Sequence, residues 1–91
     1  MSRPTGRITV VSSKFREDLR YWIETDRKTA LRVLDLVAAI LADPFNGIGK
    51  PEPLKHQYAG YWSRRITDEH RFIYKVEGKL LTIVQVRFHY E

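Results

Sequence analysis

A single glutamate lies between two prolines near the middle of the chain, in the segment Pro51-Glu52-Pro53. Each proline fixes its own φ at about −65° and drives the preceding residue toward an extended conformation. The backbone carrying Glu52 is therefore stiff before folding, which favours a catalytic carboxylate because less orientational freedom is lost in the transition state. A rigid linker with a solvated glutamate is the commoner meaning of an isolated Pro-Glu-Pro. The basic residues nearest to it are candidates for substrate binding: Lys50, Lys55 and His56.

Arginines follow as the pair Arg64-Arg65 and as Arg71. Guanidinium groups bind phosphate bidentately and stay charged at neutral pH. Side chains alternate between the two faces of a strand, so at most one arginine of the pair shares a face with Arg71. The alternative, at least as well supported by the sequence, is an exposed pair of strand charges that form salt bridges with Asp68 and Glu69.

Histidine and tyrosine lie close to the end of the chain, as His89-Tyr90 before Glu91. A histidine exchanges a proton near neutral pH, and a tyrosine offers a stacking ring and a hydroxyl. Successive residues of a strand face opposite ways, so both side chains reach one cleft only if the preceding strand ends before them. The alternative is a frayed tail, which is common at chain ends.

The remaining histidines are weaker candidates, and no metal site is expected. His70 alternates with Phe72 and Tyr74, which is more typical of a partly buried, hydrogen-bonded residue than of a catalyst. The chain has no cysteine, no helical His-x-x-x-His and no ladder of carboxylates, so we predict neither a metal nor a cofactor.

Together these residues suggest cleavage of RNA by its own 2′-hydroxyl. That reaction needs a base for the hydroxyl, an acid for the leaving oxygen and cations for the crowded phosphate. Glu52 is the candidate base, His89 the candidate acid, and Arg65 and Arg71 the candidate electrostatic stabilisers. Unperturbed pKa values of about 4.3 for glutamate and about 6.5 for histidine are suitably staggered for this pair.

The composition is compatible with such a substrate. The 91 residues suffice for one domain with a modest core, and the formal net charge of +5 favours a polyanionic partner, although a cationic surface also keeps small proteins soluble. No long apolar run is present, so the sequence predicts neither a membrane span nor a signal peptide, and we expect a cytoplasmic protein.

The apolar periodicity predicts an α+β fold with a small, largely antiparallel sheet and two helices packed on one of its faces. Residues 8–11 read as a strand, and Ser12-Ser13 and Thr25-Asp26 as the caps of two helices. The second helix shows an apolar stripe through Ala30, Leu34, Val37 and Leu41, widened by Leu31, Val33, Ala38 and Ile40. So broad a stripe predicts a helix buried on much of its circumference. Asp43-Pro44 ends the helix.

A long connection over residues 45–57 follows the second helix. The segments 61–66, 71–76 and 80–88 then read as strands of an antiparallel meander. We expect residues 1–7 to be a flexible extension and residues 8–91 to be a single domain.

The chain resembles the Txe/YoeB toxins of bacterial type II toxin–antitoxin systems, within the RelE/ParE superfamily. The resemblance runs from about residue 8 to residue 90. The segments that carry it are 21–26 (YWIETD), 43–45 (DPF), 47–56 (GIGKPEPLKH), 60–66 (GYWSRRI), 69–71 (EHR) and 89–90 (HY).

This resemblance implies a compact fold like that of microbial ribonucleases and a ribosome-dependent endoribonuclease that cuts mRNA in the 30S A site. The base of the family falls on Glu52, its acid on His89 and its terminal tyrosine on Tyr90. Its phosphate-stabilising arginines fall on Arg65 and Arg71. Lys55 matches a basic residue near the substrate phosphate.

The resemblance also implies partners: a homodimer, neutralised by a YefM/Phd-type antitoxin whose C-terminal segment covers the active site. Operator DNA would be bound only through the complex with the antitoxin. The chain departs from the family in its N-terminal extension and in Glu91, whose added negative charge should favour a protonated His89 but repel RNA phosphate.

Two other functions stay open on the same scaffold, because a fold does not fix a function. One is a non-nucleolytic toxin that binds a protein target such as gyrase. The other is a non-catalytic RNA-binding module. Neither would need the combination of Glu52, Arg71 and His89.

Overall fold

The computed structural model describes residues 6–88, and residues 1–5 and 89–91 lie outside the described part. Most of the extension predicted over residues 1–7 therefore falls outside it. At its inner end, the guanidinium carbon of Arg7 lies 5.8 Å from the centre of the Phe45 ring. The candidate residues His89 and Tyr90, with Glu91 after them, also lie outside the described residues, so their roles stay predictions.

Two helices follow the first strand, with the limits that their capping residues predict. Helix α1 spans Ser13–Thr25, and the Ser12 hydroxyl caps it by accepting a hydrogen bond from an amide of the first turn. Helix α2 spans Arg27–Ala42, and the Asp26 carboxylate caps it in the same way. Asp43 ends α2 immediately before a proline, as expected.

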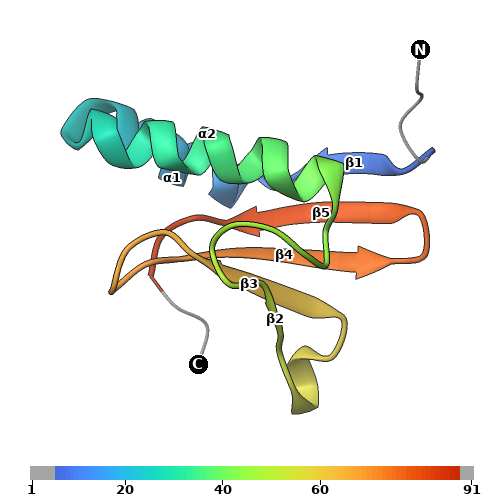
Figure 1. Ribbon diagram of the computed structural model, residues 1–91. Helices are drawn as coiled ribbons and strands as arrows, with labels where there is room; N and C mark the ends of the chain where they lie inside the picture. The colour runs from blue at the N-terminus through green and yellow to red at the C-terminus, as the bar shows by residue number, and fades with distance from the viewer. Residues whose placement is uncertain (1–5, 89–91) are drawn as a thin grey trace.

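A five-stranded sheet lies beneath the two helices, which both cover one of its faces (Figure 1). The strand order is β1-β5-β4-β3-β2, and β1 runs parallel to β5 while the other pairs are antiparallel. The strands are β1 Ile8–Val11, β2 Glu52–Pro53, β3 Tyr61–Arg65, β4 Arg71–Glu77 and β5 Leu80–Gln85. This arrangement confirms the predicted α+β class.

Two details of the sheet differ from the prediction. The connection predicted over residues 45–57 contains the short strand β2, and a 3₁₀ turn, η1, begins at its end and spans His56–Tyr58. The last strand ends at Gln85 and does not continue to residue 88. The reason is that the backbone of Val86 hydrogen-bonds to side chains of α1 instead of to a neighbouring strand.

The core lies between the helices and the sheet, and α2 buries a narrower apolar face than the broad stripe predicted for it. Its buried apolar residues are Ala30, Val33, Leu36 and Ile40. Leu34 and Leu41 of the predicted stripe are each 48% exposed. Apolar residues occur on both sides of this helix, so the sequence pattern does not fix which side faces the sheet.

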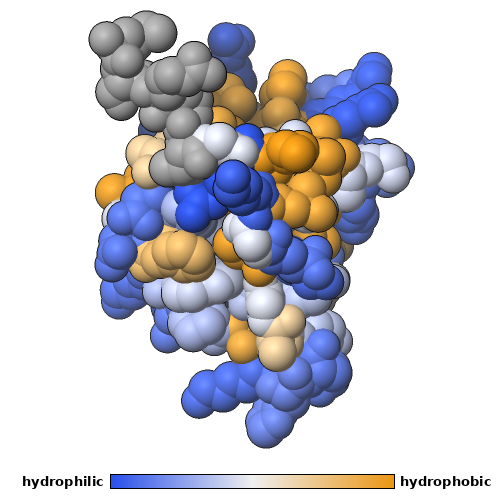
Figure 2. Space-filling view, turned by 90° about the vertical axis from the view of Figure 1, so that its right-hand side faces the viewer, coloured by the Kyte–Doolittle hydropathy of each residue, from blue (hydrophilic) through white to orange (hydrophobic). Residues whose placement is uncertain are grey.

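Apolar side chains therefore reach the surface along α2 and the loop after it. Leu31 of α2 is 58% exposed, and Phe45 and Ile48 of the loop are 41% and 47% exposed. Figure 2 shows hydrophobic residues gathered among hydrophilic ones on one side of the molecule. Within residues 6–88, no helix combines the length and the apolar character that crossing a membrane requires.

Candidate active site

A buried arginine organises the loop that leads to Glu52. Arg64 has no exposed surface and lies on the core side of β3. Its Nε donates to the Tyr74 hydroxyl at 3.1 Å, and the same hydroxyl donates to the carbonyl of Pro44 at 2.6 Å. Its terminal nitrogens donate to the carbonyl oxygens of Asp43, Asn46 and Ile48. The alternative of an exposed arginine pair is therefore wrong for Arg64.

Two glycines allow the loop to approach this arginine. A Cβ added to Gly47 would lie 3.0 Å from Arg64 Nη1, and one added to Gly49 would lie 2.9 Å from a methyl carbon of Leu36. Both glycines have positive φ, which a side chain rarely adopts. The carbonyl of Gly49 then accepts from the amide of Arg65 at 2.6 Å, which joins the end of the loop to β3.

The Pro-Glu-Pro segment becomes the edge strand of the sheet. In β2, Glu52 lies opposite Ser63 of β3, and Pro53 lies opposite Trp62. Prolines are tolerated at a sheet edge because the amide they lack need not pair. The extended backbone expected between two prolines is thus present, and the Glu52 side chain is exposed at its centre.

The pairing register places three of the predicted site residues on one face of the sheet. Directly opposed residues of an antiparallel pair point their side chains to the same side, with Cβ atoms about 4.5–5.5 Å apart. Glu52 is opposed to Ser63, and Arg65 is opposed to Arg71. Ser63 and Arg65 are two residues apart on β3, which is about 7 Å along a strand on the same face.

This face is the one turned away from the helices. Trp62 packs against the core cluster and Arg64 is buried, so the residues that alternate with them point the other way. Arg65, not Arg64, therefore shares a face with Arg71 and Glu52. We call this group of Glu52, Arg65 and Arg71 the open-face site.

The two arginines of the open-face site are held differently. Arg71 Nη1 donates to three carbonyl oxygens of the β3–β4 turn, those of Thr67, Asp68 and His70, at 2.8–3.2 Å. Arg65 Nη1 lies 3.7 Å from the fully exposed Asp68 carboxylate, and such an exposed pair contributes little. Among the described residues, the hydrogen bonds of the Arg71 guanidinium group use only Nη1. Its Nη2 and Nε can therefore donate to a bound anion.

The predicted substrate-binding residues lie on both sides of Glu52. Lys50 follows Gly49, whose carbonyl binds the amide of Arg65, and so lies at the arginine end of β2. Its φ of 53° is unusual for a residue with a side chain. Lys55 and His56 follow β2 at its other end, beyond the hydrogen bond between Leu54 and Tyr61. The structure brings Lys50 close to the arginines but not Lys55 or His56.

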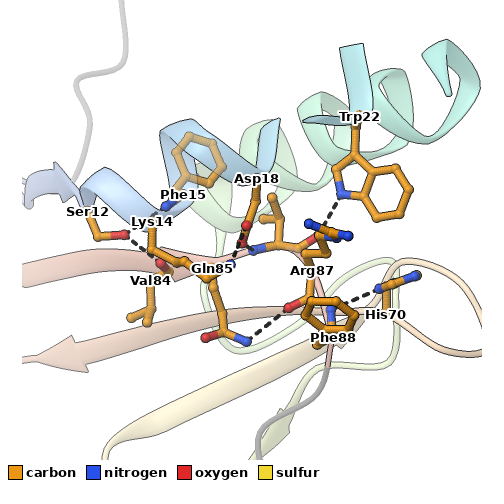
Figure 3. Close-up of polar contacts among 11 residues, drawn as sticks. Ser12, Lys14, Phe15, Asp18, Trp22, His70, Val84, Gln85, Arg87 and Phe88 are labelled. Carbon is orange, nitrogen blue, oxygen red and sulfur yellow. Dashed lines mark hydrogen bonds and ion pairs between the residues drawn. The ribbon is translucent and has the colours of Figure 1, made fainter. Parts of the chain in front are cut away.

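The chain beyond β5 passes along α1 and reaches His70, the residue before Arg71 (Figure 3). Val86 is hydrogen-bonded to Asp18 and Trp22 of α1. The carbonyl of Phe88 accepts from the amide of Arg71 at 3.1 Å. The described chain thus reaches to one residue before His89, and it does so beside an arginine of the open-face site.

Sequence reasoning missed the role of Asp18. This carboxylate is 2% exposed, accepts a hydrogen bond from the Val86 amide at 3.1 Å and pairs with Lys14. The available signal was its position, because Asp18 falls between Phe15 and Trp22 on the apolar side of α1. A carboxylate on a core-facing stripe requires a buried partner.

No cluster of three or more histidine, aspartate or glutamate side chains suited to a metal ion occurs in residues 6–88. The groups that the open-face site brings together are a carboxylate and two guanidinium groups. A carboxylate can accept a proton, and the arginines can stabilise negative charge on an oxyanion.

Comparison with known proteins gives a consistent result along nearly the whole chain. Residues 11–90 match the profile of a family described as the YoeB-like toxin of bacterial type II toxin–antitoxin systems. The toxin YoeB of Streptomyces coelicolor is 54% identical over 84 residues, which cover 92% of this chain and 99% of the relative.

Solved structures agree with this result. A YoeB/ParE toxin from Agrobacterium tumefaciens has a TM-score of 0.82 at 45% identity, covering 90% of this chain and 98% of that one. A YoeB dimer from Staphylococcus aureus has a TM-score of 0.80 at 34% identity, covering 94% and 100%. The heterotetrameric YoeB–YefM toxin–antitoxin complex of the same organism gives 0.79 at 34% identity, covering 98% and 100%.

Proposed function

The chain belongs to the YoeB-like toxins of bacterial type II toxin–antitoxin systems, and we propose that it is a ribosome-dependent endoribonuclease that cleaves mRNA in the 30S A site. The observation that carries this proposal is the open-face site. Two arginines lie directly opposed, and a glutamate sits one strand away on the same face. A purely protein-binding toxin has no need of this arrangement.

The proposed reaction uses these residues in fixed roles. The Glu52 carboxylate accepts the proton of a ribose 2′-hydroxyl, and the 2′-oxygen attacks the adjacent phosphorus. The bond from phosphorus to the 5′-oxygen breaks, and His89 donates a proton to that leaving oxygen. The products are a 2′,3′-cyclic phosphate and a 5′-hydroxyl. The reaction distinguishes RNA from DNA because the attacking group is the 2′-hydroxyl itself.

Arg65 and Arg71 stabilise the negative charge that grows on the phosphate oxygens in the transition state. Lys50 lies at the end of β2 that is next to Arg65, and it adds a third positive charge. Lys55 and His56 lie beyond the other end of β2 and would bind the RNA backbone further along. Tyr90 is proposed to contact substrate beside His89.

The same proposal includes protein partners. The staphylococcal relative is solved as a YoeB dimer and as a heterotetrameric YoeB–YefM complex. We propose that this chain likewise dimerises and is neutralised by a YefM/Phd-type antitoxin, with operator DNA bound only through that complex. The exposed apolar residues of α2, Leu31, Leu34 and Leu41, offer surface for such contacts.

The test is to purify the chain from its antitoxin complex and to map the 5′ ends of an mRNA with and without ribosomes. The expected result is cleavage within the A-site codon only when ribosomes are present. An mRNA with a 2′-deoxyribose at the scissile position should resist cleavage.

Cleavage of naked RNA at the same rate would contradict the ribosome dependence. Growth arrest without any mRNA cleavage would contradict the nuclease and would favour a toxin that binds a protein target.

A further inference from the structure

Beyond β5, the backbone amide and the backbone carbonyl of both Val86 and Phe88 are hydrogen-bonded. The Val86 amide donates to Asp18 Oδ2 at 3.1 Å, and the Trp22 indole donates to the Val86 carbonyl at 2.8 Å. Two residues later, the Phe88 amide donates to His70 Nδ1 at 2.9 Å, and the Phe88 carbonyl accepts from the Arg71 amide at 3.1 Å. The first pair of contacts comes from α1, and the second comes from His70 and from Arg71, the first residue of β4. Figure 3 shows the contact between Phe88 and His70.

Phe88 adopts a backbone conformation that a phenylalanine rarely occupies. Its φ is 65°, in the left-handed region that costs free energy for any residue with a Cβ. Such a conformation persists when surrounding contacts fix it. The hydrogen bonds that join Phe88 to His70 and to Arg71 are those contacts, and they fix the backbone of Phe88.

The hydrogen bond from Phe88 assigns a tautomer to the His70 ring. An imidazole nitrogen that accepts a hydrogen bond carries no proton, so this contact assigns the ring proton to Nε2. The ring also makes an edge contact with Trp22 at 4.8 Å between centroids and lies 5.7 Å from the Phe88 ring. His70 thus contacts both Trp22 of α1 and Phe88 of the segment after β5.

We propose that His70 is a positioning residue of the nuclease, whose Nδ1 accepts a hydrogen bond from the Phe88 amide and thereby fixes the backbone from which the chain leads to the proposed acid, His89. This proposal rests on the proposed function. His70 acts through the chain and touches no substrate. A small displacement of a general acid is costly, because about 1 Å of misplacement can reduce a rate about 100-fold.

The matched test uses two substitutions that separate the acceptor from the ring. His70→Phe keeps a flat ring against Trp22 and Phe88 but has no acceptor. His70→Asn loses the ring but places an amide oxygen near the position of Nδ1. The measurements are the steady-state kcat and KM on ribosome-bound mRNA, amide exchange at Phe88 and the Tm of each protein.

We expect His70→Phe to lower kcat about 10- to 100-fold with little change in KM, and to speed amide exchange at Phe88 at least about tenfold. His70→Asn should restore most of both. In the wild type, the ¹⁵N shift of His70 Nδ1 should be that of an unprotonated nitrogen, a measurement that needs no variant to fold.

Three results would overturn the proposal: a protonated Nδ1 at neutral pH, an unprotected Phe88 amide in the wild type, or full kcat in His70→Phe with loss in His70→Asn. The last would mean that the ring and not the acceptor matters. Failure of the proposed function has a different signature, since the wild type itself would not cleave mRNA. In that case the catalytic part of the proposal falls with it, while Phe88 amide exchange still decides the hydrogen bond.

Discussion

Arg65 and Arg71 lie directly opposite each other across the β3–β4 ladder, with both side chains on the face of the sheet that the helices leave uncovered. Like charges in directly opposed positions destabilise a sheet. The carboxylate of the fully exposed Asp68 lies 3.7 Å from Arg65 and offsets little of this repulsion. The arrangement becomes favourable when an anion binds between the two guanidinium groups.

Substitutions of these two arginines should affect the stability of the fold and the rate of cleavage differently. Arg65→Gln removes one of two opposed charges, so at low salt it should raise stability by roughly 0.2–1 kcal/mol. Arg71→Gln should lower stability, because it also loses the hydrogen bonds to three carbonyls of the β3–β4 turn. Cleavage should fall about 10²- to 10³-fold because charge stabilisation of the phosphate is lost. Denaturant melts at low and high salt, together with single-turnover rates, measure both effects.

Arg20→Gln is the control for that pair, because Arg20 is an exposed arginine of α1 that pairs only with Glu24 among the contacts found in residues 6–88. It should change neither property. Equal losses of cleavage in Arg20→Gln and Arg71→Gln would show that overall positive charge, and not the opposed pair, is what matters.

The neighbouring residue Arg64 should behave in the opposite way. Arg64→Met removes the donors that hold three loop carbonyls and the Tyr74 hydroxyl, and it should cost at least about 3 kcal/mol of unfolding free energy. Arg65→Met, one residue later, should change it by less than about 1 kcal/mol. Equal stabilities of the two variants in urea would contradict the assignment of Arg64 as the loop anchor.

Alkaline pH should act through Tyr74. Burial raises the pKa of its hydroxyl above the ordinary value of 10.0, although the Arg64 guanidinium beside it opposes the shift. The folded state therefore favours the neutral phenol. Its stabilisation is fully present below pH 10.0, the unfolded value, and is lost as pH rises through the higher folded pKa.

Tyr74→Phe provides the measurement. It should cost about 1–2 kcal/mol at pH 8, because Arg64 Nε and the Pro44 carbonyl lose their partner. The difference in unfolding free energy between wild type and variant should shrink between about pH 10 and pH 11.5. Over that range only the wild type loses the stabilisation that comes from its neutral Tyr74 hydroxyl. A difference that stays constant or grows over that range would contradict the sign of the shift.

The buried carboxylate of Asp18 should matter for the end of β5. Asp18→Ala leaves the Val86 amide without its acceptor and should cost about 1–3 kcal/mol. Asp18→Asn keeps an acceptor oxygen and should cost less, even though the pair with Lys14 is weakened. Equal losses in thermal melts of the two variants would show that the charge, and not the acceptor, is what the fold uses.

Local signals in the sequence predicted much of this fold. Ser12 and Asp26 mark the helix starts because their side chains can cap free amides, and the structure uses both in that way. The alternation along β3 separates Arg64 from Arg65. Which of the two faces the core depends on the fold around them, because only packing against the loop after α2 makes a buried arginine tolerable.

Three other features of the fold depend on contacts between distant parts of the chain and could not be predicted from local sequence patterns. The side of α2 that faces the sheet is chosen by contacts with residues far along the chain, and Leu34 and Leu41 satisfy the helical period as well as Val33 and Leu36 do. The end of β5 is set by Asp18 and Trp22, more than sixty residues earlier in the chain. The pairing of Glu52 with Ser63 likewise required the sheet register, because no periodicity marks a two-residue strand.

The most direct test of the account is the single-turnover rate at which Glu52→Gln cleaves mRNA on the ribosome. Glu77→Gln is its control, because Glu77 is an exposed glutamate at the end of β4 that pairs with Lys75. A base at the open-face site predicts that Glu52→Gln cleaves at least about 100-fold more slowly than wild type while Glu77→Gln keeps the full rate. Cleavage by Glu52→Gln at the wild-type rate would contradict it.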